Sequence, residues 1–245
     1  MKKIVYGLVA IFIMLNFSGC SGPNLPQYKI NKTDNVGYII KANPKMIHTY
    51  IGTTIFNNFE KEYPKLIKEE DVEQLLKQNL DAKLINLATY DFNELNNLIV
   101  EKDDKWSINN NALYNELIKK YNLKAIIVVS EREGGIYMYP NYLSSKSSGL
   151  LTRSFLKIQN HFAVSGFHFK LNILNPKASK EFNRGMVTAK FIYATSVSKF
   201  QQESGFIKPK NDESLTVEEQ NSIKKSILDL TRYNIKVVNK HLSNM

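Results

Sequence analysis

The chain has 245 residues, of which 43% are hydrophobic and 11% aromatic, so it can bury a core and does not have the composition of a disordered protein. Its formal net charge of +10 comes mostly from dispersed lysine, and only four of the 33 basic residues are arginine, which disfavours specific nucleic-acid binding and leaves a weak attraction to anionic lipid. The only cysteine, Cys20, excludes an intramolecular disulfide and a metal site built from several cysteines.

The first twenty residues have the three parts of a secretory signal peptide. Two lysines form the positive start, the segment 4–15 is apolar apart from one glycine, and small residues precede Cys20. A retained membrane helix is the alternative, but it needs about 20 apolar residues, and Asn16 interrupts this run. We therefore expect removal of residues 1–19, which lowers the net charge from +10 to +8 because two lysines are lost.

The end of this segment resembles the lipobox of bacterial lipoproteins. Ser18, Gly19 and Cys20 match the lipobox pattern, and Phe17 stands where leucine is usual. The resemblance implies that Cys20 is lipidated, that the signal is cleaved before it, and that the lipid anchors the new N-terminus. The serine after Cys20 is similar to the outer-membrane sorting signal of lipoproteins in cells with two membranes. It implies an outer-membrane location facing the periplasm.

A flexible tether is expected over residues 20–35, because the part after the cysteine contains two prolines and polar residues without periodicity. Fully extended, it would reach roughly 50 Å at about 3.3 Å per residue. One α/β domain is expected over residues 36–245, with no internal repeat and no second linker.

The first half of this domain alternates between predicted strands and helices. Strands are expected at 36–42, 82–89 and 123–130, helices at 48–62, 69–79 and 109–121, and a piece of undecided type at 92–100. This order indicates a layered α/β domain with some parallel pairing. The strand at 123–130 is apolar throughout, which favours a central position with both faces covered.

The second half changes to long alternating segments and one helix. Residues 155–174 and 185–197 predict two long strands in an antiparallel hairpin. Residues 137–143 predict an edge strand or loop, and 200–215 a surface loop. Thr216 and Glu219 form a capping box that opens a C-terminal amphipathic helix. We expect this helix to pack on a mixed sheet.

The expected architecture is similar to small α/β domains of periplasmic lipoproteins that assist envelope machinery. The curli-secretion lipoprotein and the N-terminal domain of the Tol translocation protein are examples. The similarity concerns the order of elements over residues 36–242, and no diagnostic motif accompanies it. Architecture alone does not carry function.

Catalytic, metal and cofactor motifs are absent from the sequence. It contains no G-x-S-x-G elbow, no P-loop, no G-x-G-x-x-G and no H-E-x-x-H. Two of the four histidines, His161 and His168, lie seven residues apart and face opposite sides of one predicted strand. Separate structural histidines, no metal and no cofactor are therefore expected.

Three places carry candidate contacts to a ligand or partner, each with a structural alternative. The predicted helix at 48–62 opens with polar side chains that fit an anion at a helix start or a plain helix cap: His48, Thr49 and Thr53. The predicted central strand ends in charges that fit either a ligand site at the carboxyl end of a strand or a solvated turn: Glu131, Arg132 and Glu133. Around Pro140, a group of tyrosines suits a protein or glycan interface and equally packing on the domain's own sheet: Tyr137, Tyr139 and Tyr142.

Two functional hypotheses follow from these features. The first is a lipid-anchored, non-catalytic binding or assembly protein of the bacterial cell envelope that acts through a protein partner. The alternative is an envelope hydrolase that uses Glu131 and Glu133 with His48. The oligomeric state stays open.

Overall fold

The computed structural model describes residues 30–53, 58–102, 105–131, 134–138, 141–145, 147–155, 158–174, 192–193, 207, 209 and 214–244. The signal segment and Cys20 lie outside these residues. None of the helices in the described ranges is long and apolar enough to cross a membrane.

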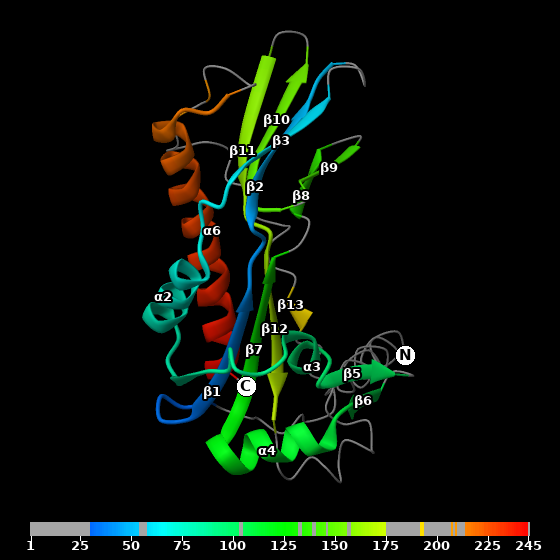
Figure 1. Ribbon diagram of the computed structural model, residues 1–245, viewed down its shortest axis with the longest axis vertical. Helices are drawn as coiled ribbons and strands as arrows, with labels where there is room; N and C mark the ends of the chain where they lie inside the picture. The colour runs from blue at the N-terminus through cyan, green and yellow to red at the C-terminus, as the bar shows by residue number, and fades with distance from the viewer. Residues whose placement is uncertain are drawn as a thin grey trace, which may run out of the picture.

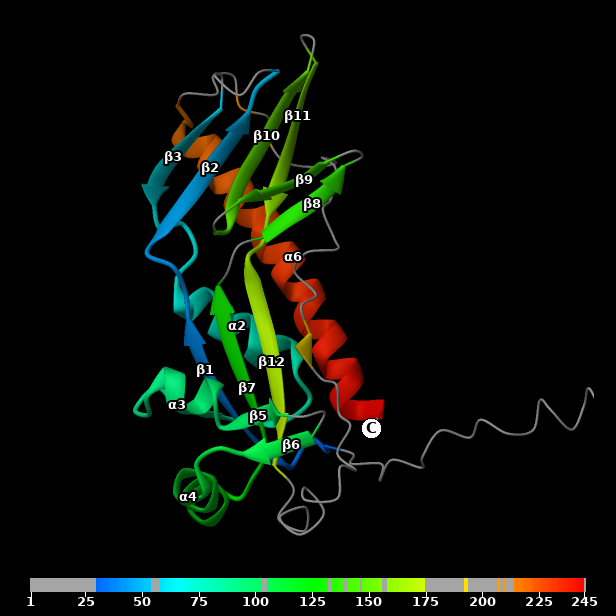
Figure 2. The same ribbon diagram turned by 90° about the vertical axis from the view of Figure 1, so that its right-hand side faces the viewer.

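The fold is α/β as expected, but its strands form two main sheets where one was predicted. The five-stranded sheet has the order β13-β12-β7-β1-β4, formed by β1 (Asn35–Lys41), β4 (Lys83–Asn86), β7 (Leu123–Glu131), β12 (Phe167–Ile173) and β13 (Ile192–Tyr193). The four-stranded sheet has the order β11-β10-β2-β3, formed by β2 (Lys45–Ile51), β3 (Phe59–Pro64), β10 (Gly149–Phe155) and β11 (Ile158–Val164). Figures 1 and 2 show the two sheets one above the other along the long axis.

Strand β7 has the central, doubly covered position that its apolar sequence predicts. It pairs in parallel with β1 and antiparallel with β12. Ile127 and Val129 belong to one buried core, whereas Ile126 and Val128 belong to a second core on the opposite face. A strand buried on both sides has no solvent-facing positions, which explains the unbroken apolar run.

Helices cover both faces of the five-stranded sheet (Figure 1). On one face lie α2 (Glu69–Asn79) and α6 (Val217–Asn244), and on the other lie α3 (Phe92–Asn96) and α4 (Asn111–Tyr121). The helices predicted at 69–79 and 109–121 are thus confirmed, and the undecided piece contains α3 followed by a strand. Two small hairpins complete the described fold: β5 (Ile99–Lys102) with β6 (Lys105–Ile108), and β8 (Gly134–Met138) with β9 (Asn141–Ser145).

Helix α6 runs along both sheets (Figure 1). It starts with the predicted capping box, in which Thr216 N donates to Glu219 Oε2 at 2.7 Å and Glu219 N donates to Thr216 Oγ1 at 3.2 Å. Its 28 residues correspond to about 42 Å at 1.5 Å per residue. Residues of α6 share one core with residues of both sheets, including Ile223, Ile227, Ile235, Leu150 of β10 and Ile127 of β7. The helix therefore joins the two sheets into one folded body.

The chain enters this body beside the end of α6. Ile30 is buried, and its N–H donates to the carbonyl oxygen of Leu242 at 3.1 Å. The entry point therefore lies at the end of the five-stranded sheet, far from the four-stranded sheet (Figure 2). We call the five-stranded sheet the proximal sheet and the four-stranded sheet the distal sheet. The folded part already includes Ile30, within the stretch assigned to the tether, and residues 21–29 lie outside the described ranges.

The helix predicted over 48–62 is wrong. Strands β2 and β3 occupy this region as an antiparallel pair, with Tyr50 opposite Phe59, and residues 54–57 lie outside the described ranges. The apolar residues there fit helical spacing, but β-branched and aromatic side chains also suit a half-buried strand. Pairing of β2 with β10, about 100 residues later in the chain, decides between the two.

The single strand predicted over 155–174 is also wrong. The strand is interrupted at Ser165 and Gly166, so that β11 belongs to the distal sheet and β12 to the proximal sheet. The alternating pattern continues through this break and therefore hides it. The expected antiparallel hairpin survives in part, because Phe169 of β12 pairs with Tyr193 of β13.

An ion pair joins α2 to α6 on the surface of the helical layer. Lys224 Nζ donates to Asp71 Oδ2 at 2.8 Å, and the same oxygen accepts the backbone N–H of Lys68 at 2.8 Å. Partial burial by itself raises the pKa of Asp71, but these two hydrogen bonds outweigh it, so the pKa of Asp71 lies below its usual value.

Replacing Asp71 with asparagine should lower the free energy of unfolding by about 1 kcal/mol at pH 7. Because the folded-state pKa is depressed, the stabilisation is present above the unfolded-state value of about 3.9 and is lost as the pH falls through the folded-state value. Urea unfolding at pH 7 and pH 3 measures this change. The exposed pair of Asp229 with Arg232 provides the control, because Asp229→Asn should change little at either pH. A constant effect of Asp71→Asn at both pH values would contradict the assignment.

Candidate functional site

The two sheets meet at a waist, which we define by residues 42–44, Glu131, 147–148 and 165–166. Residues 42–44 join β1 directly to β2, residues 165–166 join β11 directly to β12, and residues 147–148 lead into β10 after the chain has left β7. The carboxyl ends of the parallel strands β1 and β7 also lie here. In open α/β sheets this is the edge where ligands usually bind.

Glu131, at the end of β7, holds the waist together. Its Oε1 accepts hydrogen bonds from Ser147 Oγ at 2.8 Å and from Ser148 N at 2.9 Å, and its Oε2 accepts one from Asn43 N at 2.7 Å. The side-chain amide of Asn43 also donates to Ser147 Oγ at 3.0 Å. One half-buried carboxylate thereby ties the β1–β2 connection to the segment that leads into β10.

Ser148 and Gly149 extend this network to the other crossing segment. Gly166 N donates to Ser148 Oγ at 2.9 Å, and Ile47 N donates to the carbonyl oxygen of Ser148 at 3.3 Å. Gly149 lies opposite Ile47 in the parallel pairing of β10 with β2. A Cβ on Gly149 would lie only 1.9 Å from the carbonyl oxygen of Ile47, so only glycine permits this approach of the two strands.

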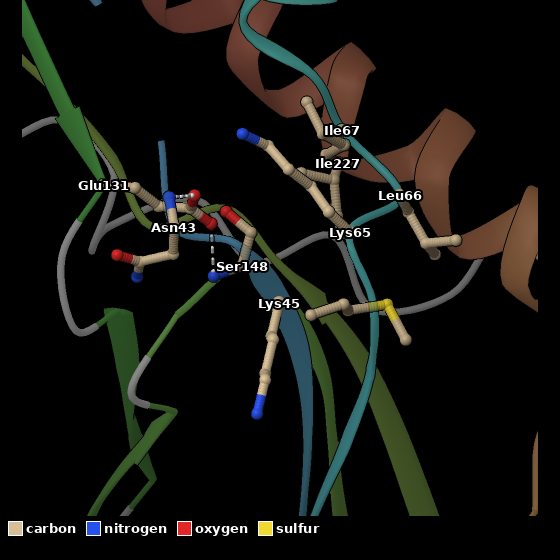
Figure 3. Close-up of a pocket in the computed structure, with 9 residues that line it drawn as sticks. Asn43, Lys45, Lys65, Leu66, Ile67, Glu131, Ser148 and Ile227 are labelled. Carbon is tan, nitrogen blue, oxygen red and sulfur yellow. Dashed lines mark hydrogen bonds between the residues drawn. The ribbon is translucent and has the colours of Figure 1, made fainter. Parts of the chain in front are cut away.

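A shallow hollow lies beside the waist (Figure 3). Glu131, Asn43 and Ser148 form one side of it, and Lys65, Ile67 and Ile227 lie across from them. The space in it that a water molecule could occupy is only about 10 Å³, which is about the minimum needed to hold one water molecule. Ligand pockets usually measure roughly 300–1,000 Å³. The hollow is therefore too small to enclose a small-molecule ligand.

The ligand hypothesis for Glu131, Arg132 and Glu133 stays a prediction. Glu131 lines the hollow and is half-buried, so it is not a solvated turn residue, and its two oxygens accept hydrogen bonds from three protein donors. Arg132 and Glu133 lie outside the described residues. The sequence analysis singled out this strand end but did not indicate Asn43, Ser147 and Ser148. Asn43 lies 88 residues from Glu131 in the chain, Ser147 and Ser148 lie 16 and 17 residues away, and none of the three belongs to a recognisable motif.

A second polar cluster is buried in the distal sheet. His48 Nε2 and His161 Nδ1 each lie 2.9 Å from Thr152 Oγ1. The three side chains are 0%, 3% and 0% exposed for His48, His161 and Thr152. The Phe59 ring packs edge-on against the His48 ring with 5.7 Å between centroids. Two histidines expected to be separate thus share one hydroxyl group, and His48 does not line the hollow beside Glu131.

Strand pairing explains why the sequence did not reveal this cluster. Thr152 and His161 are opposite each other in the antiparallel pair of β10 and β11. A hairpin predicted over residues 149–164 would have brought Thr152 and His161 together. His48 joins through the parallel pairing of β2 with β10, for which no local pattern exists.

The remaining candidate residues do not form a common site in the described structure. Thr49 is buried in β2, and Thr53 is exposed, with its Oγ1 3.5 Å from the carbonyl oxygen of Ser154. The helix start proposed to hold an anion does not exist, because these residues belong to a strand and its end.

The tyrosine segment forms a hairpin in which the backbones of Tyr137 and Tyr142 are paired between β8 and β9. Strand β9 lies next to β2 and β10, on the distal sheet. Tyr139 is outside the described residues. No group of three or more metal-binding side chains occurs within the part of the chain that the structure describes.

Comparison of this chain with protein-family models, with curated proteins and with solved structures finds no match.

Proposed function

We propose that this chain is a lipid-anchored, non-catalytic binding or assembly protein of the bacterial cell envelope. It acts through a protein partner, and its anchor lies in the outer membrane facing the periplasm. The lipobox-like end of the first segment, Ser18-Gly19-Cys20, supports the anchor. The proposal for the partner rests on how the folded body is attached to that anchor.

The observation that carries the proposal is the entry of the chain at one end of an elongated body. Ile30 lies beside Leu242, at the end of α6 farthest from the distal sheet. Because α6 is about 42 Å long, the distal sheet can stand that much farther from the bilayer than the entry point. Nine residues between Cys20 and Ile30 add at most about 30 Å when extended. Such an arrangement suits a surface presented to a partner.

The hydrogen bonds that His48 and Glu131 already make within the protein disfavour the hydrolase alternative. That mechanism needs His48 near a carboxylate that can reach a substrate. His48 is instead buried against Thr152, and Glu131 already accepts hydrogen bonds from Asn43, Ser147 and Ser148. The two groups belong to different clusters.

Site-specific photocrosslinking in cells tests the proposal. A photoreactive residue at Glu60, exposed on β3 of the distal sheet, is compared with one at Lys119, exposed on α4 beside the proximal sheet. We expect a discrete crosslinked protein from position 60 and none from position 119. The same experiment with Cys20→Ser should yield an uncleaved precursor without acyl label and no crosslink, because a protein without the lipid is not held in the outer membrane at high local concentration near the partner.

Two results would count against this function. Mass spectrometry that finds an unmodified Cys20 sulfur in the mature chain removes the anchor. Equal crosslinking from positions 60 and 119 removes the distal partner surface while leaving the anchor intact.

A further inference from the structure

We propose that the buried row His48–Thr152–His161 makes the packing of the distal sheet against α6 sensitive to acid. The row is fully formed by side chains of three strands, β2, β10 and β11, and it lies in the interior of the protein. The two hydrogen bonds of the row limit how many protons its two imidazole rings can carry, so the stability of the row depends on pH.

The single proton of the Thr152 hydroxyl group sets this limit. A hydroxyl group donates one hydrogen bond and can accept others. With a ring nitrogen 2.9 Å away on each side and no third partner described for its oxygen, Thr152 keeps its own proton hydrogen-bonded only when it donates to one ring and accepts from the other. The ring that receives the hydroxyl proton must present a lone pair, so at least one imidazole is neutral while the row is intact. An imidazolium carries a proton on both nitrogens, so two imidazoliums would both donate to the lone pairs of Thr152 Oγ1 and would leave the buried hydroxyl proton without an acceptor.

The row lies on the face of the distal sheet that α6 covers. His48 is paired with Leu150, and Leu150 with Ala163, so these three side chains point to the same side of the sheet. Thr152 lies two residues after Leu150 on β10 and is paired with His161, so the whole row points to that side as well. Leu150 and Ala163 share one buried core with Ile223 and Ile227 of α6. An added charge here would therefore be placed between the sheet and the first half of the helix.

Within the described part of the chain, the titratable groups on this face of β2 and β3 are one lysine and two tyrosines. Lys61 of β3 is paired with His48, Tyr63 lies two residues farther along the same face of β3, and Tyr50 lies two residues after His48 on β2. From α6, Glu219 is buried, and its Oε2 accepts the hydrogen bond of Thr216 N in the capping box. The amino-terminal end of α6 also carries a partial positive charge.

The expected consequence is a loss of stability under acid conditions. A free imidazole titrates near pH 6.5, so the unfolded chain binds protons below this value that the intact row excludes. Where the unfolded state binds more protons than the folded state, stability decreases as the pH is lowered. For each proton excluded, the ratio of folded to unfolded protein should fall about tenfold per pH unit below 6.5.

Nitrogen-15 NMR of the histidine side chains in the unaltered protein tests the proton count directly. At pH 7.5 we expect at least one of two nitrogens, Nε2 of His48 and Nδ1 of His161, to show the shift of an unprotonated nitrogen. Protons on both of these nitrogens in the folded protein would overturn the proposal. This measurement needs no variant, so it decides the matter even where a substitution prevents folding.

Unfolding by urea at pH 7.5 and pH 5.5 tests the coupling. In the double variant His48→Gln/His161→Asn, amide groups replace the two ring nitrogens that face Thr152 and do not titrate. Between pH 7.5 and pH 5.5, the folding equilibrium constant of this variant should fall at least about tenfold less than that of the unaltered protein. The control His168→Gln removes a half-buried histidine of β12 outside the row and should keep that fall.

Amide hydrogen exchange locates the effect. Protection factors in the first half of α6, residues 217–231, should fall between pH 7.5 and 5.5 in the unaltered protein and stay constant in the double variant. An acid-dependent fall that is the same in the double variant and the unaltered protein would overturn the proposal.

Discussion

Replacing Gly149 with alanine should destabilise this protein by at least about 3 kcal/mol, because the new methyl group meets backbone atoms that cannot move aside. The added Cβ would lie 1.9 Å from the carbonyl oxygen of Ile47 and 2.8 Å from its carbonyl carbon. Relief requires separation of β10 from β2, which are paired in parallel at this point. The melting temperature should fall by roughly 6–12 °C for a chain of this size.

Gly37→Ala is the matched control for this prediction. A Cβ on Gly37 would meet methyl groups of Leu87 at 2.6 Å and Leu123 at 3.0 Å, which are ends of flexible side chains. We expect a loss of about 1 kcal/mol there. Thermal unfolding of both variants distinguishes the two cases. Equal stability of the Gly149→Ala and Gly37→Ala variants would show that the close approach of β10 to β2 is not a constraint.

Replacing Glu131 with glutamine should lower the free energy of unfolding by about 2–3 kcal/mol. The substitution keeps the size of the side chain, but it removes the charge and turns one acceptor into a donor. That donor then faces one of three groups that also donate: Asn43 N, Ser148 N and Ser147 Oγ. Hydrogen bonds to an ionised group are stronger than neutral ones, so the loss exceeds that of an ordinary hydrogen bond.

The control for Glu131 is Glu62→Gln. Glu62 pairs with Lys45 on the surface, where its side chain is 58% exposed, and such a pair contributes about 0–1 kcal/mol. Urea unfolding of both variants gives the two free energies. A Glu131→Gln variant within about 0.5 kcal/mol of the unaltered protein would mean that the Glu131 carboxylate does not hold the waist together.

The two predictions together concern how the waist is built. In an open α/β sheet, the carboxyl ends of adjacent parallel strands leave a crevice for a ligand. Here the chain continues from β1 into the distal sheet, and the segment before β10 enters the same space. Glu131 binds these segments where a cofactor or substrate would otherwise lie. This use of the strand end supports a structural role for Glu131.

Local patterns in the sequence determined most of the helices and the central strand. Asn110 accepts a hydrogen bond from Leu113 N at the start of α4, and Asn122 ends that helix in the left-handed conformation, as their residue types favour. The capping box of Thr216 and Glu219 starts α6. The apolar run of β7 has its predicted central position. Each of these features depends on residues within a few positions of one another.

The tertiary structure alone decided the division into two sheets and the composition of both polar clusters. Residues near His48 fitted a helix by spacing, and only the pairing of β2 with β10 makes them a strand. The same pairing brings His48 to Thr152, and the waist brings Asn43 to Glu131. Contacts between segments about 100 residues apart leave no periodicity in the sequence. Their energy is gained only when the whole core forms, so no short stretch of residues reveals them.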